Sequence, residues 1–179
     1  LGPFHPKAHI LPFPEKNSGL SETLEKYDEK QLAGVIIEPI QATAGLKFAD
    51  KQSLIKLREF TTKNKIPLIF DETFTGFCRT GKMFGYEHFD VTPDIIILGK
   101  AISAGFPAGL VISTEEILTF WEKGTQSSTF QLNPVAATAS LFFLDQIKNH
   151  GLLNNISLQS EHFNNLLNCL LYTSDAADD

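Results

Sequence analysis

Short apolar runs alternate with longer amphipathic stretches along most of the chain. Runs with the length and composition of buried strands cover residues 33–39, 66–72, 93–100 and 108–113. These runs are apolar on both faces of the strand. They are therefore typical of a parallel sheet, which is buried on both sides, rather than of a sheet with one solvent-exposed face. The pattern therefore predicts an α/β fold, with a mainly parallel sheet covered by helices on both faces.

Helical periodicity fills the segments between and after these runs. The predicted helices cover residues 21–31, 51–64, 115–123, 134–149 and 152–170. Asp50 and Asn133 stand at the positions of N-caps, and Pro134 occupies a first helical position, which tolerates proline. A capping box is expected at residues 113–116, whereas four prolines in residues 1–20 predict a loop there.

The two ends of the chain depart from this alternation. The chain begins in a proline-rich stretch without a starting methionine, and it ends in an acidic, unpatterned tail. We therefore expect a gene fragment, in which residues 1–151 are the central part of a large domain and residues 152–169 are a helix leading towards a further domain. Residues 170–179 are expected to be a non-native tail.

Composition narrows the class of protein. The 179 residues carry a formal net charge of -6 at pH 7, with 42% hydrophobic and 20% charged residues, which is ordinary for a globular protein. A net negative charge offers no basic patch for nucleic acid, and no apolar run of about 18 residues predicts a membrane span. Cys78 and Cys169 are too few for a disulfide framework and show no metal-binding spacing. We therefore expect a reducing, cytoplasmic setting, with a mitochondrial one left open.

Three consecutive predicted strands end in charged side chains, which are Glu38, Asp71 and Lys100. The carboxyl ends of parallel strands meet at one edge of a sheet, which is where such folds bind ligands. A lysine brought there by a buried strand suits a nucleophile, because a desolvated lysine favours its reactive neutral form. With an aspartate opposite, the pair suits Schiff-base catalysis with pyridoxal phosphate (PLP), although a plain structural ion pair explains the same two residues.

The residues around these strand ends form an ordered series of motifs. They are Glu-Pro-Ile-Gln (38–41), Asp-Glu-Thr-Phe-Thr-Gly-Phe-Cys-Arg-Thr-Gly (71–81), Pro93-Asp94, Gly99-Lys100, Ser-Thr-Phe (128–130) and Asn133-Pro134. The series resembles the class III (ornithine/4-aminobutyrate-type) aminotransferases over residues 15–167. This resemblance implies the PLP-dependent transferase fold of type I, PLP as cofactor, and a homodimer with shared active sites.

By this resemblance, Lys100 is the lysine that forms the Schiff base, and Asp71 is the partner of the pyridine nitrogen. Thr73 would stack its branched side chain on the pyridine ring, and Glu38 would lie near the cofactor. Thr129 would bind the cofactor phosphate from the neighbouring subunit, and no metal takes part. The residues alone favour a plain loop threonine at position 129, and they leave open for Glu38 the role of a strand-end acid that binds backbone amides.

The remaining polar residues of these motifs are expected to have structural roles. Glu72 would bind the backbone of the loop, and residues 79–81 would shape that loop near a subunit boundary. Cys78 is interpreted as a small packing residue rather than a nucleophile, because no histidine stands in a usable relation to it. His88 is expected to be exposed.

Three positions depart from the pattern of the family. Thr73 replaces Val or Ile but keeps the branched shape, and Phe74 replaces a glutamine that in some members binds the 3-hydroxyl of the cofactor. Thr43 stands where members that use glutamate often carry an acid that gates a substrate-binding arginine, and it cannot serve as that gate. Glutamate semialdehyde aminomutases, amine–pyruvate aminotransferases and phospho-lyases therefore stay open, beside transamination between an amine or amino acid and an oxo acid.

Other functions remain as alternatives. A PLP-dependent aminomutase, racemase or phospho-lyase needs the same Lys100 and Asp71. A dinucleotide-binding module has little support, because no strand is followed by G-x-G-x-x-G, and a non-catalytic interaction module needs none of the matched residues. The chain lacks the family's phosphate-binding turn, second stacking aromatic and substrate-carboxylate arginine. We therefore expect the parent protein to be the enzyme and the 179 residues alone to be inactive.

Overall fold

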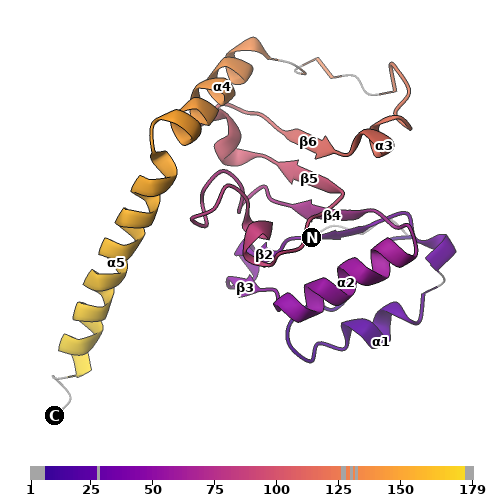
Figure 1. Cartoon of the computed structure of the whole chain (residues 1–179), viewed down its shortest axis with the longest axis horizontal. Helices are drawn as coiled ribbons and strands as arrows, with labels where there is room; N and C mark the ends of the chain where they lie inside the picture. Colours follow the sequence, from indigo (N-terminus) through magenta and orange to yellow (C-terminus); the bar gives the residue numbers. More distant parts are fainter. Residues whose placement is uncertain (1–6, 28, 126–127, 130, 132, 176–179) are drawn as a thin grey trace.

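The computed structural model describes residues 7–27, 29–125, 128–129, 131 and 133–175. Its centre is a four-stranded sheet in the order β1 (Val35–Ile37), β4 (Leu68–Asp71), β5 (Ile95–Leu98) and β6 (Leu110–Ser113) (Figure 1). The first three strands run parallel, and β6 pairs antiparallel with β5. The four predicted strands and the mainly parallel sheet are thus confirmed, although each strand is shorter than the apolar run that contains it.

A second, two-stranded sheet follows β1 directly. In it β2 (Ile40–Gln41) pairs antiparallel with β3 (Lys47–Phe48), and the 3-10 turn η2 (Ala42–Ala44) joins them. Gly45 closes this turn with a φ of 84°, in the left-handed region that glycine adopts without strain. Strands of two residues are too short to leave a periodic pattern, so the sequence did not predict this hairpin.

Helices and short 3-10 turns connect the strands. They are α1 (Leu20–Leu24), η1 (Glu29–Gln31), α2 (Lys51–Lys63), η3 (Gly85–His88), η4 (Lys100–Ser103), α3 (Glu115–Leu118), α4 (Pro134–Asn149) and α5 (Leu152–Asp175). The predicted N-caps of α2 and α4 are confirmed. The Asp50 carboxylate accepts a hydrogen bond from the Ser53 N–H at 2.9 Å, and the Asn133 side chain accepts one from the Val135 N–H at 2.9 Å.

Three helical segments differ from the sequence-based expectation. The stretch 21–31 is not one helix, because tight turns replace helical bonding after Leu24, with the Tyr27 N–H donating to the Leu24 carbonyl. The capping box expected at 113–116 does not form, since the N-cap Thr114 makes no side-chain bond, and α3 spans a single turn. Helix α5, expected to end near residue 170, continues to Asp175.

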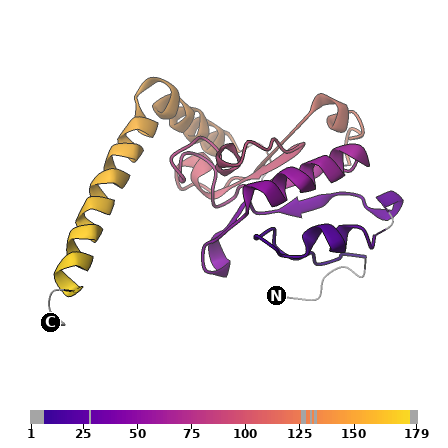
Figure 2. The ribbon, with the colours of Figure 1, turned by 60° about the horizontal axis from the view of Figure 1, so that its bottom comes forward.

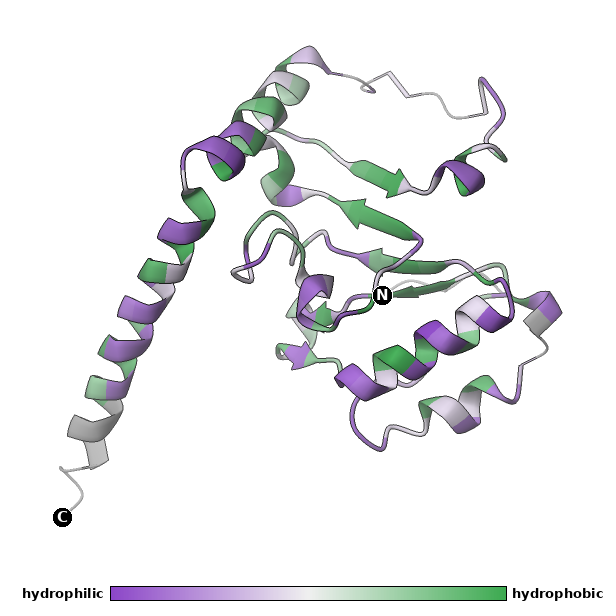
Figure 3. Cartoon of the chain, viewed as in Figure 1, coloured by the Kyte–Doolittle hydropathy of each residue, from purple (hydrophilic) through white to green (hydrophobic). Residues whose placement is uncertain are grey.

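The larger hydrophobic core lies between α2 and the sheet. Leu54 and Leu57 of α2 are 0% and 1% exposed and share one buried cluster with Leu68 and Phe70 of β4, which are both 0% exposed. Figure 3 shows the strands among the most hydrophobic parts of the chain. A second cluster joins the end of β5 to η4 and α4, and its members include Phe77, Leu98, Ile102, Phe143, Leu144 and Ile147. The two clusters together hold the carboxyl ends of β4 and β5 in place.

Apolar side chains also reach the surface, on the edge strands of the sheet, in loops and on α4 and α5. Ile36 of β1 is 61% exposed and Val111 of β6 is 46% exposed, so the described residues cover the edge strands less than the central ones. Beyond α4, helix α5 extends away from the sheet (Figures 1 and 2) and carries the exposed Phe163 on its surface. None of the described helices combines the length and the apolar character needed to cross a membrane.

Candidate active site

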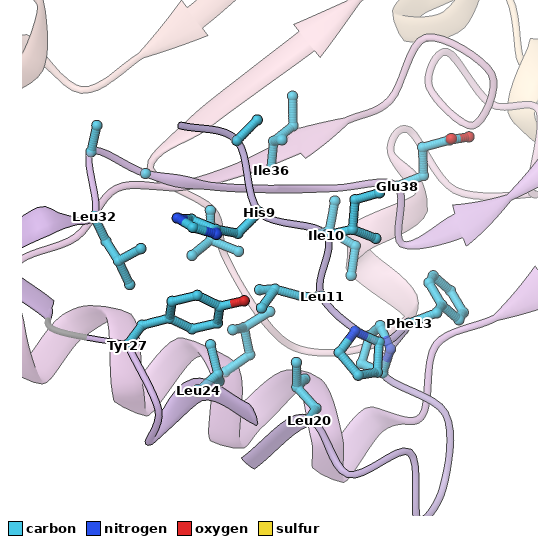
Figure 4. Close-up of a pocket in the computed structure, with 18 of the residues that line it drawn as sticks. His9, Ile10, Leu11, Phe13, Leu20, Leu24, Tyr27, Leu32, Ile36 and Glu38 are labelled. Carbon is cyan, nitrogen blue, oxygen red and sulfur yellow. The ribbon is translucent and has the colours of Figure 1, made fainter. Parts of the chain in front are cut away.

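The ends of three parallel strands bring the predicted acids and the lysine to one edge of the sheet. Glu38 follows β1 and Asp71 ends β4, and both line one cavity of about 760 Å³. Asp71 pairs in register with Ile97, three residues before Lys100. Glu38 lies at one end of that cavity, away from His9 and Tyr27 (Figure 4). The strand order thus brings these strand ends to one edge of the sheet, with Glu38 and Asp71 lining one cavity and Lys100 lining a separate hollow.

Asp71 is held by the turn that follows it. The residue is half-buried, and its Oδ1 atom accepts a hydrogen bond from the Thr73 N–H at 2.9 Å. Such a local bond is typical of aspartate at the start of a turn, and it limits the rotation of the carboxylate. The acid is thus oriented before any ligand arrives.

Glu72 anchors the whole loop between β4 and η3. It is 1% exposed, and its carboxylate accepts hydrogen bonds from the Gly85 N–H at 2.9 Å, the Tyr86 N–H at 2.7 Å and the Thr75 hydroxyl. A Cβ on Gly85 would lie 2.9 Å from the Glu72 carboxylate, so glycine is needed there. The expected role of Glu72 as a ligand of loop backbone is confirmed.

Thr73 packs against the backbone just before Lys100. A Cβ built on Gly99 would lie 3.0 Å from the Thr73 methyl group, closer than side chains normally approach. Gly99 therefore lets the loop after β4 lie directly on the end of β5. Thr73 is half-buried beside the lysine, which is compatible with the stacking role that the resemblance gives it.

Lys100 begins η4 in an uncommon backbone conformation. Its φ is 45°, in the left-handed region that residues with side chains seldom adopt, and such outliers gather at functional sites. The desolvated setting expected from the sequence is not found, because Lys100 is exposed. The physical reason is that the loop of residues 104–107 beside it is itself exposed and does not cover the amine.

The contacts of Lys100 are aromatic rather than ionic. Within the described residues no carboxylate forms an ion pair with it, so the alternative of a structural Lys100–Asp71 ion pair is not supported. Its Nζ atom instead lies 3.3 Å from the centroid of the Phe74 ring. Sequence reasoning treated Phe74 only as a departure from the family and missed this contact, because no periodicity relates the two residues.

Thr129 is not brought to these residues. It is exposed in the segment before α4, and it does not line the cavities that contain Asp71 or Lys100. Phe130, quoted with it in the motif, lies outside the described residues. The resemblance places Thr129 in the site of a neighbouring subunit, and that assignment stays a prediction.

The other motif residues have the structural character that the sequence indicates. Cys78 is 0% exposed, and burial together with the nearby Glu87 charge raises the pKa of its thiol, so it stays protonated and unreactive. His88 is exposed, with its Nε2 atom 3.1 Å from the Thr80 carbonyl oxygen. Among the described residues no group of acids, histidines and cysteines could hold a metal ion.

Asp94 sets the position of β5 relative to β4. Its Oδ2 atom accepts a hydrogen bond from the Leu68 N–H at 2.7 Å and lies 2.8 Å from a guanidinium nitrogen of Arg58 on α2. This pair links the helix to the start of both strands, far from the carboxyl ends. The sequence showed Asp94 as part of a motif but gave no indication of this role.

Comparisons with known proteins show the family of the chain. A family model described as Aminotransferase class-III matches residues 1–177. The chain belongs to this family. It is 43% identical over 145 residues to an acetylornithine aminotransferase of Prochlorococcus marinus, and 38% identical over 160 residues to an ornithine aminotransferase of Oceanobacillus iheyensis. These matches cover 80% and 89% of the chain but 34% and 39% of the relatives. The chain therefore spans little more than a third of their length.

Solved aminotransferase structures share the fold. The acetylornithine aminotransferase from Elizabethkingia anophelis superposes with a TM-score of 0.77 at 32% identity, covering 87% of this chain and 39% of that one. An ornithine aminotransferase from Toxoplasma gondii, described with partial occupancy of PLP at its active site, gives a TM-score of 0.81 at 30% identity and covers 93% of this chain and 38% of its own. The predicted fold class is thereby confirmed.

Proposed function

We propose that this chain is the central, cofactor-binding part of a PLP-dependent aminotransferase. The observation that carries the proposal is the placement of Asp71 and Lys100 at the carboxyl ends of adjacent parallel strands. When bound, PLP supplies an electron sink for the carbanion that forms on the substrate carbon. The whole protein would move an amino group between an amine or amino acid and an oxo acid.

The residues present fit that cofactor. The oriented Asp71 carboxylate suits a protonated pyridine nitrogen, because an ionised acid keeps a neighbouring cation charged. The exposed amine of Lys100 can reach an aldehyde group, and Thr73 beside it offers a methyl group to a flat ring. Glu38 lines the same cavity as Asp71 and would order the loop around it.

Lys100 would also carry the proton of the reaction. When free of the cofactor, its amine would act as general base and then as general acid towards the substrate carbon. We further propose that the parent protein is a homodimer in which Thr129 of one subunit binds the cofactor phosphate of the other. The names of the relatives favour ornithine or acetylornithine as amino donor, while Thr43 argues against the acidic gate of ornithine-type members.

The absorbance spectrum of the parent protein with PLP tests the proposal. We expect an absorbance band of the Schiff base that Lys100→Ala abolishes and that the matched change Lys123→Ala, at an exposed lysine outside the site, leaves unchanged. Asp71→Asn should weaken the band and remove transamination. A band that survives Lys100→Ala would overturn the assignment, and product analysis would distinguish transamination from aminomutase, racemase or phospho-lyase chemistry.

A further inference from the structure

The aromatic ring of Phe74 faces the amine of Lys100. The Nζ atom lies 3.3 Å from the ring centroid, well inside the range of about 6 Å over which an ammonium group is attracted to an aromatic face. The two residues come from different elements, since Phe74 belongs to the turn after β4 and Lys100 follows β5. No described carboxylate pairs with Lys100, so the ring takes the place of a counter-charge.

The backbone around Phe74 is fixed on both sides. The Glu72 N–H donates to the Ile97 carbonyl at 2.9 Å, which ties the start of the turn to β5, and the Gly76 N–H donates to the Glu72 carbonyl at 2.9 Å, which closes the turn. A Cβ on Gly76 would lie 3.0 Å from a methyl group of Leu98, so the turn packs directly on the strand. These contacts hold the backbone that carries Phe74 against the end of β5.

The backbone of Lys100 is fixed in the same way. The Ile102 N–H donates to the Gly99 carbonyl at 3.2 Å, and Ile102 and Ser103 are buried beneath it. The left-handed φ of Lys100 therefore belongs to a turn that is packed from below, and it sets the direction in which the side chain leaves. The contact with the ring thus joins two turns whose backbones are both held by hydrogen bonds and packing.

We infer that Phe74 is a positioning residue whose ring holds the ammonium group of Lys100 whenever that amine is not joined to the cofactor. The inference rests on the proposed function, because it concerns the lysine that would carry the cofactor. Arg79 lines the same hollow of about 570 Å³ as Lys100, so this hollow carries a second positive charge. A carboxylate there would bind the ammonium group more strongly and accept hydrogen bonds from it, whereas the ring holds the group more weakly and cannot take its proton.

Nuclear magnetic resonance of the cofactor-free chain, with lysines reductively methylated with ¹³C, tests the contact. The ring current of Phe74 should move the methyl signal of Lys100, identified by its loss in Lys100→Arg, upfield of the signal of the exposed Lys123. Phe74→Leu should return the signal to the position of Lys123, and Phe74→Trp should keep it shifted. Phe120→Leu, at a ring that is 83% exposed, is the matched control and should change nothing. An unshifted signal in the original chain, or a shift that survives Phe74→Leu, overturns the inference.

The rate of labelling tests the consequence. A contact of this strength at an exposed site slows the reaction of Lys100 with a limiting aldehyde, so Phe74→Leu should speed its labelling about 2- to 5-fold relative to Lys123. Equal rates in both chains would show that the ring does not hold the amine. Neither measurement uses PLP or catalysis. A negative result in either one therefore does not contradict the proposed function, and a failed test of the proposed function does not contradict the contact between Phe74 and Lys100.

Discussion

Replacing Glu72 should unfold the loop that carries the site before it alters any chemical group there. Its buried carboxylate accepts hydrogen bonds from two backbone N–H groups, of Gly85 and Tyr86, and from the Thr75 hydroxyl. A hydrogen bond to a charged group contributes about 1.5–3 kcal/mol, so the two backbone bonds alone contribute about 3–6 kcal/mol, and Glu72→Ala should cost at least about 3 kcal/mol. That loss is close to the whole stability of a marginal domain. Glu72→Gln is the more informative variant because it should leave the chain folded. Its side-chain amide keeps one oxygen acceptor, so one backbone N–H loses its partner, and the free energy of unfolding should fall by about 1–3 kcal/mol.

Urea denaturation measures this loss directly. For a slope of about 2 kcal/mol per molar, the midpoint of Glu72→Gln should fall by about 0.5–1.5 M. Glu59→Gln removes the same charge from an exposed position on α2, and its free energy of unfolding should stay within about 0.5 kcal/mol of the original. If the two glutamine variants unfold at the same urea concentration, Glu72 does not anchor the loop.

Three further predictions concern the helix cap, the cysteines and the close approach at Gly99. The pKa of Asp50 lies below its usual 3.8 because the carboxylate accepts a hydrogen bond from the Ser53 backbone N–H. The ionised carboxylate therefore stabilises the folded chain fully above pH 3.8, and this stabilisation is lost as the pH falls through the lowered pKa. The stability difference between the original chain and Asp50→Asn should therefore shrink between pH 4 and pH 2 in acid-denaturation curves. Iodoacetamide at pH 8 should label the exposed Cys169 well before Cys78, as read by peptide mass; equal labelling would contradict burial of the Cys78 thiol. Gly99→Ala should destabilise the chain and Thr73→Ser should partly restore it, whereas purely additive effects in a double-mutant cycle would show that the two residues do not touch.

Much of the fold and the outline of the site could be predicted from sequence because both depend on strand ends. An apolar run followed by a charged residue is visible in the sequence, and parallel pairing then brings Glu38, Asp71 and Lys100 to one edge. The N-caps of α2 and α4 were also predictable, since capping depends on one side chain and the backbone beside it.

Features that depend on tertiary contact could not be predicted. The exposure of Lys100 depends on what covers it, and the loop of residues 104–107 carries no periodic signal that says where it lies. The contact with Phe74 joins residues 26 positions apart, through a turn whose shape is set by the buried Glu72. The hairpin β2–β3 and the single turn of α3 are too short for any periodicity to show.

The central claim is that Lys100 is the residue that carries the cofactor, and borohydride reduction followed by peptide mass mapping tests it most directly. The parent protein is incubated with PLP, reduced and digested, and the added pyridoxyl mass is located on the sequence. The account predicts one modified lysine, in the peptide that contains Lys100, and loss of the modification in Lys100→Ala. Modification of another lysine, or an even spread over exposed lysines such as Lys123, would contradict it.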